Sequence, residues 1–253
     1  MATKRRIHSP ASRTKRKRVA TQPIELAHVF LELTTSVEPT WDSHEPENYI
    51  TRLSGNVCIS SDESDCMVVS TVSAFSVRLS NALDDGVSWF EVLDSYNDDI
   101  ALYSALVEPD GSSYTEWVQS KFEPFASDLL ILDRIRIKPQ YRGNGYGLYA
   151  AQLVIQAFGP LGGIVACAPA PYELAQKRDR SSVEGAGTPG NKEPLPGWKP
   201  AQAKLREFWS LLGFEPLPAF DVFVLCLTAR QPSMQDIIQK YFERKSVPPS
   251  RVQ

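Results

Sequence analysis

The sequence predicts a mixed α/β fold in which a central, twisted, mixed sheet is flanked by helices. Segments rich in β-branched or alternating apolar residues recur along the chain, as strands require. Other segments place apolar residues at helical spacing. At 134–159 a strand pattern passes into a helix pattern through three glycines in five residues, Gly143, Gly145 and Gly147. Glycine is poor inside either element, so backbone at this point must bend sharply or lie close to something.

Two strands and two helices are expected in the first half of the chain. Ile24–Leu33 and Met67–Leu79 have strand composition, and polar loops lie between them. Ser88–Tyr96 predicts a short helix, as does 112–125, whose Ser/Thr-rich start offers an N-cap. For 99–107 helix and strand both remain open.

The second half has a clearer pattern of alternating strands and helices. A strand at 129–139 precedes a helix at 146–159, which ends at Gly159-Pro160. The expected elements that follow are a strand at Gly162–Pro171, a long loop at 176–200, a helix at Ala201–Phe214 capped by Gly213, a strand at Asp221–Thr228 and a helix at 233–245. We therefore expect one domain at 24–245, between a disordered basic tail at 1–23 and a polar tail at 246–253.

Composition excludes several classes of protein. The chain has 253 residues, of which 42% are hydrophobic, enough for a real core. No apolar run reaches the roughly 18–20 residues of a membrane span, and no apolar signal-peptide core follows the N-terminus, so we expect no membrane partner. The four cysteines contain no C-x-x-C pair and the three histidines form no cluster. This predicts neither disulfides nor a metal site, and it fits a reducing, intracellular compartment.

Charge is divided into three blocks along the chain. Residues 1–24 carry eight Lys or Arg and no acid, residues 25–128 carry 20 acids and three bases, and residues 129–253 carry ten acids and 16 bases. Such asymmetry indicates that the blocks face ligands of different charge. The simpler alternative is that both faces are only solvated.

The basic N-terminal tail is predicted to be a localisation signal rather than a folded element. Lys4 to Arg18, "KRRIHSPASRTKRKR", has two basic clusters around a short polar spacer, as a bipartite nuclear localisation signal has. Mitochondrial targeting is the rival, because the segment is Arg-rich and acid-free. Solid basic blocks without an amphipathic stripe favour the nucleus, with the cytoplasm as the alternative. Contact with nucleic acid is expected only through this tail.

The glycine turn has the geometry of a phosphate site. A strand, a glycine-rich turn and a helix direct backbone N–H groups and the helix dipole toward one spot. The run G-N-G-Y-G lacks the third glycine of a dinucleotide fingerprint, and no Gly-Lys-Ser/Thr follows for a Walker loop. Both nucleotide classes are rejected.

The run does fit R-x-x-G-x-G, from Arg142 to Gly147, preceded by "IKPQYRG" at Ile137–Gly143. In these residues the chain resembles the GNAT superfamily of acyl-CoA-dependent N-acyltransferases. The resemblance continues through the strand at 162–171 and the helix segment "LREFWSLLGF", and it covers roughly 129–228. The acidic first half matches only in having plausible strands and helices.

The resemblance implies acetyl-CoA as cosubstrate and no metal. Backbone amides of the turn would hold the CoA pyrophosphate, with the glycines letting the phosphates approach. The alternative is a glycine-rich turn without a ligand. The implied cofactor-binding residues are Ile137, Arg142, Gly143, Asn144, Gly145, Tyr146 and Gly147.

Asp133 is the candidate general base. Strict alternation places it on one face of the strand with Leu129, Ile131, Ile135 and Ile137, as the single charge there. Burial would raise its pKa and suit it to accept the proton of an amine. The alternative is a structural carboxylate that pairs with Arg136 or caps a turn.

The general acid of the resembling family is missing here. That family carries a tyrosine four residues before the glycine of "GF", and this position is Trp209. An indole cannot donate a useful proton, so core packing is the expected role of Trp209. The expected function is acetyl transfer to an amine, either a small molecule or a basic peptide drawn to the acidic half of the chain. The alternative is a regulatory module that binds acyl-CoA without turnover.

Overall fold

The computed structural model describes residues 29–36, 45–60, 66–171, 174, 196–228 and 231–246. The expected basic tail at 1–23, most of the expected loop at 176–200 and residues 247–253 lie outside these ranges.

A seven-stranded sheet forms the centre of the molecule, in the order β1-β2-β3-β4-β5-β7-β6. Only β4 and β5 pair in parallel, and every other neighbouring pair is antiparallel. The expected central mixed sheet flanked by helices is thus confirmed. The strands are β1 Val29–Ser36, β2 Ile50–Ser60, β3 Cys66–Val77, β4 Leu129–Ile137, β5 Ile164–Cys167, β6 Glu215–Pro216 and β7 Phe223–Cys226.

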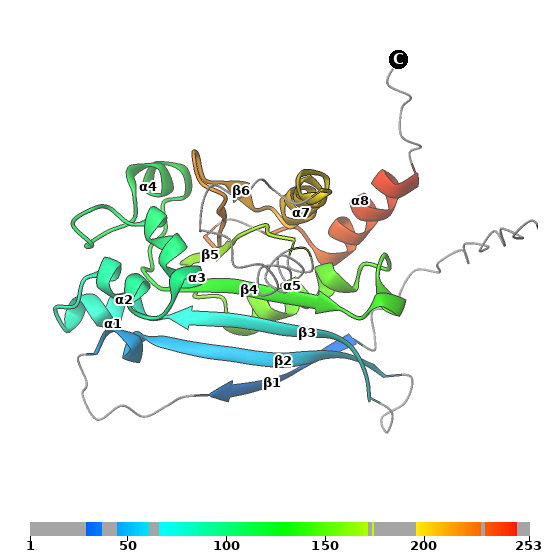
Figure 1. Cartoon of the computed structure of the whole chain (residues 1–253), viewed down its shortest axis with the longest axis horizontal. Coiled ribbons are helices and arrows are strands. Elements are labelled where there is room, and N and C mark those ends of the chain that lie inside the picture. The colour runs from blue at the N-terminus through cyan, green and yellow to red at the C-terminus, as the bar shows by residue number, and fades with distance from the viewer. Residues whose placement is uncertain are drawn as a thin grey trace, which may run out of the picture.

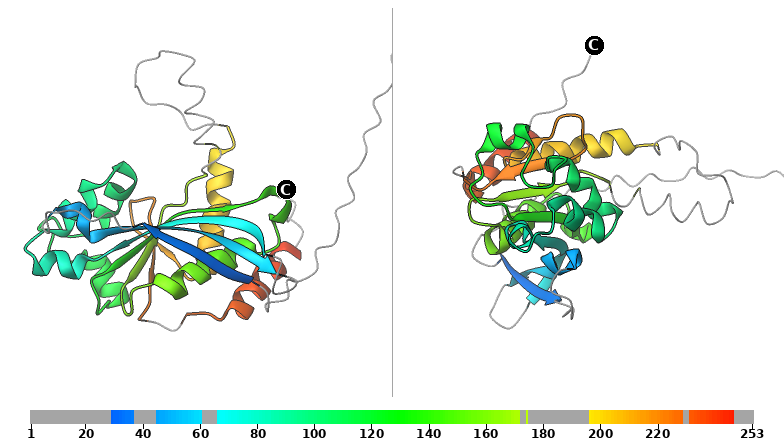
Figure 2. Two further views of the ribbon diagram at one scale, coloured as in Figure 1. Left: turned by 90° about the horizontal axis from the view of Figure 1, so that it is seen from below. Right: turned by 90° about the vertical axis from the view of Figure 1, so that its left-hand side faces the viewer.

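Helices cover the sheet in two groups (Figure 1). Helices α1 to α4 gather at one end of the sheet, whereas α7 and α8 lie together at the other, and Figure 2 shows the same separation. The helices and 3-10 turns are η2 Pro46–Tyr49, α1 Leu79–Asp84, α2 Trp89–Ser95, α3 Asp98–Ala101, η3 Leu102–Leu106, α4 Glu116–Phe122, η4 Pro139–Tyr141, α5 Tyr146–Phe158, α7 Trp198–Leu211 and α8 Met234–Ser246.

Each group of helices packs on a different set of strand side chains. Leu129 and Ile131 of β4 belong to the core formed with α1 to α4. Leu130 and Leu132 belong to the core formed with α5, α7 and α8. Alternate side chains of β4 therefore face two separate helix layers, as the period of a strand requires.

A bulge at Asp133 interrupts this alternation. Leu132 pairs with Ala74 and Arg134 with Ser73, so Asp133 is an extra residue in β4. Beyond the bulge Ile135 and Ile137 pack in the same core as Leu130 and Leu132. The expectation that Ile135 and Ile137 share a face with Leu129 and Ile131 is therefore wrong, because one inserted residue reverses the faces of all that follow.

The parallel pairing of β4 with β5 is short. It joins Leu129–Leu132 to Ile164–Cys167 and includes no later residue of β4. From Asp133 onward, β4 therefore has no strand of the described chain on its β5 side. This unpaired edge begins at the bulge.

Several elements differ from the sequence expectations. β2, β6 and α1 were not anticipated, and α7 begins at Trp198, inside the expected loop. The ambiguous segment 99–107 forms α3 and η3, with Asn97 capping α3 through the Ile100 N–H. The start of α2 is as expected: Ser88 and Glu91 form a reciprocal capping box. Thr115 precedes α4 without a side-chain cap, and a Glu108 carboxylate oxygen instead accepts the Glu116 N–H at 2.8 Å.

Candidate functional site

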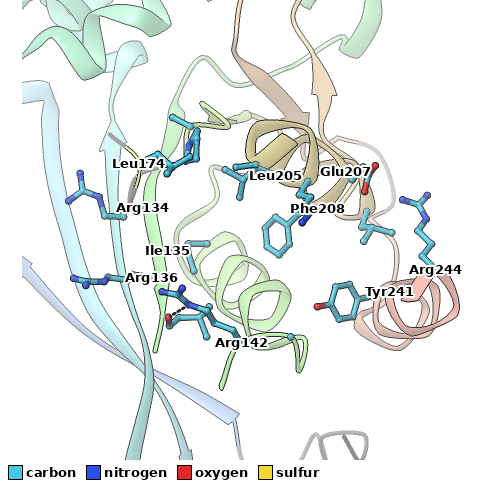
Figure 3. A pocket seen from close by; sticks show the side chains of 17 residues that line it. Arg134, Ile135, Arg136, Arg142, Leu174, Leu205, Glu207, Phe208, Tyr241 and Arg244 are labelled. Carbon is cyan, nitrogen blue, oxygen red and sulfur yellow. Dashed lines mark hydrogen bonds between the residues drawn. The ribbon is translucent and has the colours of Figure 1, made fainter. Parts of the chain in front are cut away.

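A pocket of about 960 Å³ lies along the unpaired edge of β4. Its walls come from residues 134–137 of β4, the turn before α5, the segment after β5, and helices α7 and α8. Figure 3 shows these elements surrounding a common space. Side chains from both faces of β4 reach the pocket, as the exposed edge of a strand allows.

The pocket wall carries a strong excess of positive charge. Five basic side chains and one acidic side chain line it. Among the described residues, Arg136, Lys204 and Arg244 form no ion pair. Basic groups left without carboxylate partners favour an anionic ligand. The basic residues are Arg134, Arg136, Arg142, Lys204 and Arg244, and the acid is Glu207.

Three of the expected cofactor-binding residues lie on this wall. Ile137, Arg142 and Gly143 line the pocket directly. The Arg142 side chain is held against the end of β4, because its Nε donates to the Ile137 carbonyl oxygen at 3.0 Å (Figure 3). The turn thus presents a guanidinium group at a defined place beside the strand edge.

The start of α5 leaves backbone donors unused. Gly145 is the N-cap of α5, and its carbonyl accepts the N–H groups of Leu148 and Tyr149. Within the described chain, no backbone carbonyl accepts the N–H of Asn144, Gly145, Tyr146 or Gly147. The first amides of a helix lack intrahelical partners, and together with the helix dipole they favour an anion.

Each glycine of the turn also has a conformational or packing reason. Gly143 and Gly145 both have a φ of 85°, which strongly favours glycine. A Cβ at Gly147 would lie 3.2 Å from the Phe208 ring, and one at Gly145 would lie 3.0 Å from Ile238 of α8. The glycines therefore let α7 and α8 approach the turn, so their number alone does not identify a phosphate site.

Asn144 and Tyr146, the remaining turn residues, differ in exposure. Asn144 is half-buried, whereas Tyr146 is 9% exposed and packs edge-to-face on Tyr141. Burial, with a smaller effect of Tyr141, raises the pKa of Tyr146, so its phenol stays neutral. The Tyr146 side chain thus belongs to the core rather than to the pocket.

Asp133 lies at the bulge, where β4 parts from β5, and its side chain is half-buried. It makes no hydrogen bond or ion pair with any described residue, so the alternative pairing with Arg136 is absent there. A buried phenol of η3 is in electrostatic contact with Asp133. Burial of this phenol, Tyr103, raises its pKa well above the ordinary value, and the nearby Cys167 and Asp133 raise the pKa further.

Trp209 is a core residue in this structure. It is 8% exposed and packs edge-to-face on both Phe208 and Phe214. No proton donor therefore stands at the position where the resembling family carries its tyrosine.

The pocket residues of α7 and α8 were not among the site residues expected from the sequence. Lys204 of α7 and Tyr241 and Arg244 of α8 line the same pocket as the turn. A signal was present in α8, where Ile237, Tyr241 and Arg244 follow helical spacing. That pattern mixes apolar and basic residues on one face, which a helix lying wholly on a core would not need.

The described residues contain no group of three or more His, Cys, Asp or Glu side chains placed to hold a metal ion. None of their helices combines the length and apolar character needed to cross a membrane.

Comparison with solved structures gives a distant likeness. No family model matches the sequence, and no curated protein matches it. Among solved structures, the chain is similar to the crystal structure of AtaTR bound with AcCoA. The two share 12% identity over 85% of this chain and 98% of that chain, with a TM-score of 0.35. A likeness this distant has no bearing on the function of the present chain.

Proposed function

We propose that the chain is an acyl-CoA-dependent N-acetyltransferase that binds acetyl-CoA in the pocket along β4. The observation that carries the proposal is the pocket itself: five basic side chains and one acid surround about 960 Å³ beside a phosphate-type turn. CoA carries three phosphate groups, and its size fits a cavity of this class. The sequence resemblance of the turn to the GNAT superfamily supports the same ligand.

The parts of acetyl-CoA would occupy different sections of the pocket. The pyrophosphate would lie at Arg142, Gly143 and the unused amides at the start of α5. The pantetheine arm, which contains amide groups, would follow the unpaired edge of β4, where strand N–H and C=O groups lack a neighbouring strand. The thioester would then reach the bulge at Asp133.

Asp133 would act there as the general base. The amine nitrogen attacks the thioester carbonyl carbon, the C–N bond forms, and the C–S bond breaks as CoA thiolate leaves. The proton lost by the nitrogen goes to the Asp133 carboxylate, directly or through one water, and the thiolate takes a proton from water. The half-buried position of Asp133, without an ion pair to a described residue, leaves its oxygens available for this step.

The acceptor would be a cationic amine, either a small molecule or a basic peptide. Residues 25–128 carry 20 acids and three bases, and in this molecule they build β1 to β3 and the helices α1 to α4. Of these elements, β1 to β3 lie beside β4 in the sheet, and the layer of helices α1 to α4 packs on the face of β4 that carries Leu129 and Ile131. A cation approaching the bulge from this layer would be attracted by its negative potential.

A regulatory protein that binds acyl-CoA without turnover is the second candidate. Trp209 favours it, because the buried indole replaces the proton donor of the resembling family. This candidate needs the same pocket and ligand but no proton transfer at Asp133.

Two measurements separate the candidates. Isothermal titration calorimetry with CoA tests the pocket, and release of free CoA thiol from acetyl-CoA with a panel of amines tests turnover. We expect binding together with amine-dependent thiol release. Binding without release for any amine would support the regulatory candidate, and absence of CoA binding in folded protein would overturn both.

A further inference from the structure

Helix α8 is fixed beside the glycine turn by two isoleucines. Ile237 is fully buried in the core shared with α5 and α7. Ile238 lies against Gly145, where a Cβ would come within 3.0 Å of its Cδ1. Two strong apolar contacts thus hold α8 against the start of α5.

The next turn of α8 faces the pocket. Tyr241 and Arg244 follow Ile237 by four and seven residues, spacings that place all three on the same face of a helix. Both line the pocket, and Figure 3 shows Tyr241 between Arg142 and Arg244. The face that anchors α8 therefore also supplies an aromatic ring and a guanidinium group to the pocket wall.

Arg244 has no carboxylate partner among the residues that the structure describes. It is exposed and forms no ion pair with any described residue. On the same helix, Lys240 is also exposed but does not line the pocket. Of these two cations of α8, only Arg244 is therefore placed to contact a ligand in the pocket.

We propose that Tyr241 and Arg244 of α8 form the site for the 3′-phosphorylated adenosine end of CoA. This inference rests on the proposed binding of acetyl-CoA. The thioester would lie at the bulge of β4 and the pyrophosphate at the turn, so the nucleotide end must continue past the turn, on the side that α8 occupies. The ribose 3′-phosphate is a compact dianion, and an arginine binds such a group through paired, charge-assisted hydrogen bonds. The Tyr241 ring would offer a flat surface to the adenine.

The test compares CoA with 3′-dephospho-CoA, which differs only at that phosphate. Calorimetry on the full chain should show that the unaltered protein binds CoA roughly tenfold or more tightly than 3′-dephospho-CoA. Arg244→Gln should remove most of this ratio by weakening CoA binding, while the affinity for 3′-dephospho-CoA changes little. Arg244→Lys should keep part of the ratio, because it keeps the charge but loses the paired geometry.

Lys240→Gln is the matched control, since it removes an equal charge from the same helix outside the pocket. It should leave the CoA ratio unchanged, and thermal melting of all three variants checks that α8 still folds. If Arg244→Gln and Lys240→Gln have equal effects, or if Arg244→Gln keeps the full ratio, the inference is wrong. If the unaltered protein binds neither nucleotide, the proposed function itself has failed.

Discussion

Asn144 is the turn residue best suited to test the phosphate site by substitution. It is half-buried and does not have a positive φ, so unlike its glycine neighbours it tolerates other side chains without backbone strain. It stands directly before Gly145, the N-cap of α5. A charge introduced here lies beside the unused amides.

Asn144→Glu should weaken CoA binding by roughly tenfold or more, because a carboxylate would repel the pyrophosphate at close range. Asn144→Gln, which adds the same bulk without charge, should bind CoA nearly as well as the unaltered protein. Calorimetry at low and high salt measures both affinities. Equal losses in the two variants would point to a steric effect, and no loss in either would place the phosphates elsewhere.

Asp133→Asn should lower kcat by roughly 100-fold or more, as expected for loss of a general base, with little change in CoA affinity. Steady-state thiol release across pH, combined with calorimetry, separates the two quantities. Asp94→Asn is the control, because Asp94 is an exposed acid of α2 that does not line the pocket. Retention of full turnover by Asp133→Asn would make Asp133 a structural residue.

At the scale of elements, η3 brings a buried tyrosine to the sheet. Tyr103 is 3% exposed and packs in the core between α1 to α4 and the strands. Because its pKa is raised in the folded protein, the folded chain keeps a proton that the unfolded chain releases above a pH of about 10. The contribution of the neutral Tyr103 phenol to the stability of the fold is therefore complete below a pH of about 10 and is lost as the pH rises further.

The free energy of unfolding should therefore fall as the pH rises above about 10, and Tyr103→Phe should reduce this fall. Urea unfolding at a series of pH values from 8 to 11 measures both slopes. Tyr114 also has a pKa raised by burial, so some of the alkaline loss should remain in the variant. An unchanged slope in Tyr103→Phe would show that its phenol does not contribute.

The helices and strands differ in how well their own sequences predict them. α2, α5, α7 and α8 carry caps or clear apolar periodicity, and each lies within a few residues of its expected range. β2 was missed because its residues, "ITRLSGNVCIS", interrupt strand composition with Gly, Asn and Ser. It forms because both of its edges are paired, with β1 and with β3. Tertiary pairing here outweighs local propensity.

The candidate site could be predicted only in part from the sequence, because part of it also depends on tertiary pairing and packing. Arg142 and Gly143 stand in a local motif, and both lie on the pocket wall. The bulge at Asp133 depends on the register between β3 and β4, which local periodicity cannot reveal. Lys204 and Arg244 line the same pocket as the turn only because segments distant in the sequence pack together.

Across the full chain, the division into an acidic half and a basic half predicts that salt weakens the capture of a cationic acceptor. Long-range attraction of a cationic amine to the acidic layer is screened over about 8–10 Å at physiological salt. We expect kcat/KM for spermine and for a lysine-rich peptide to fall as salt rises, and kcat/KM for a neutral arylamine to change little. Thiol release at low and high salt measures each value. A preference for the neutral amine without a salt effect on the cations would contradict this assignment.

We propose that the basic N-terminal tail is a nuclear localisation signal. Removing residues 1–24 should leave the melting temperature unchanged and move a fluorescent fusion from the nucleus to the cytoplasm. Microscopy of the full-length and shortened fusions makes the comparison. A shortened fusion that stays nuclear, or a full-length fusion found in mitochondria, would refute the proposal. The same truncation tests whether the basic tail competes with a cationic acceptor. If it does, removing the tail should lower the KM for that acceptor.

The position of α8 along the chain has a consequence for synthesis. All strands of the sheet precede α8, yet Tyr241 and Arg244 belong to the pocket wall. On the ribosome, a growing chain therefore exposes every strand before the residues that complete the pocket emerge. If the nucleotide end of CoA depends on α8, stalled chains ending before 241 should capture CoA weakly, and full capture should appear only after α8 has left the exit tunnel. The onset of CoA capture would then report when α8 packs on the rest of the fold during synthesis.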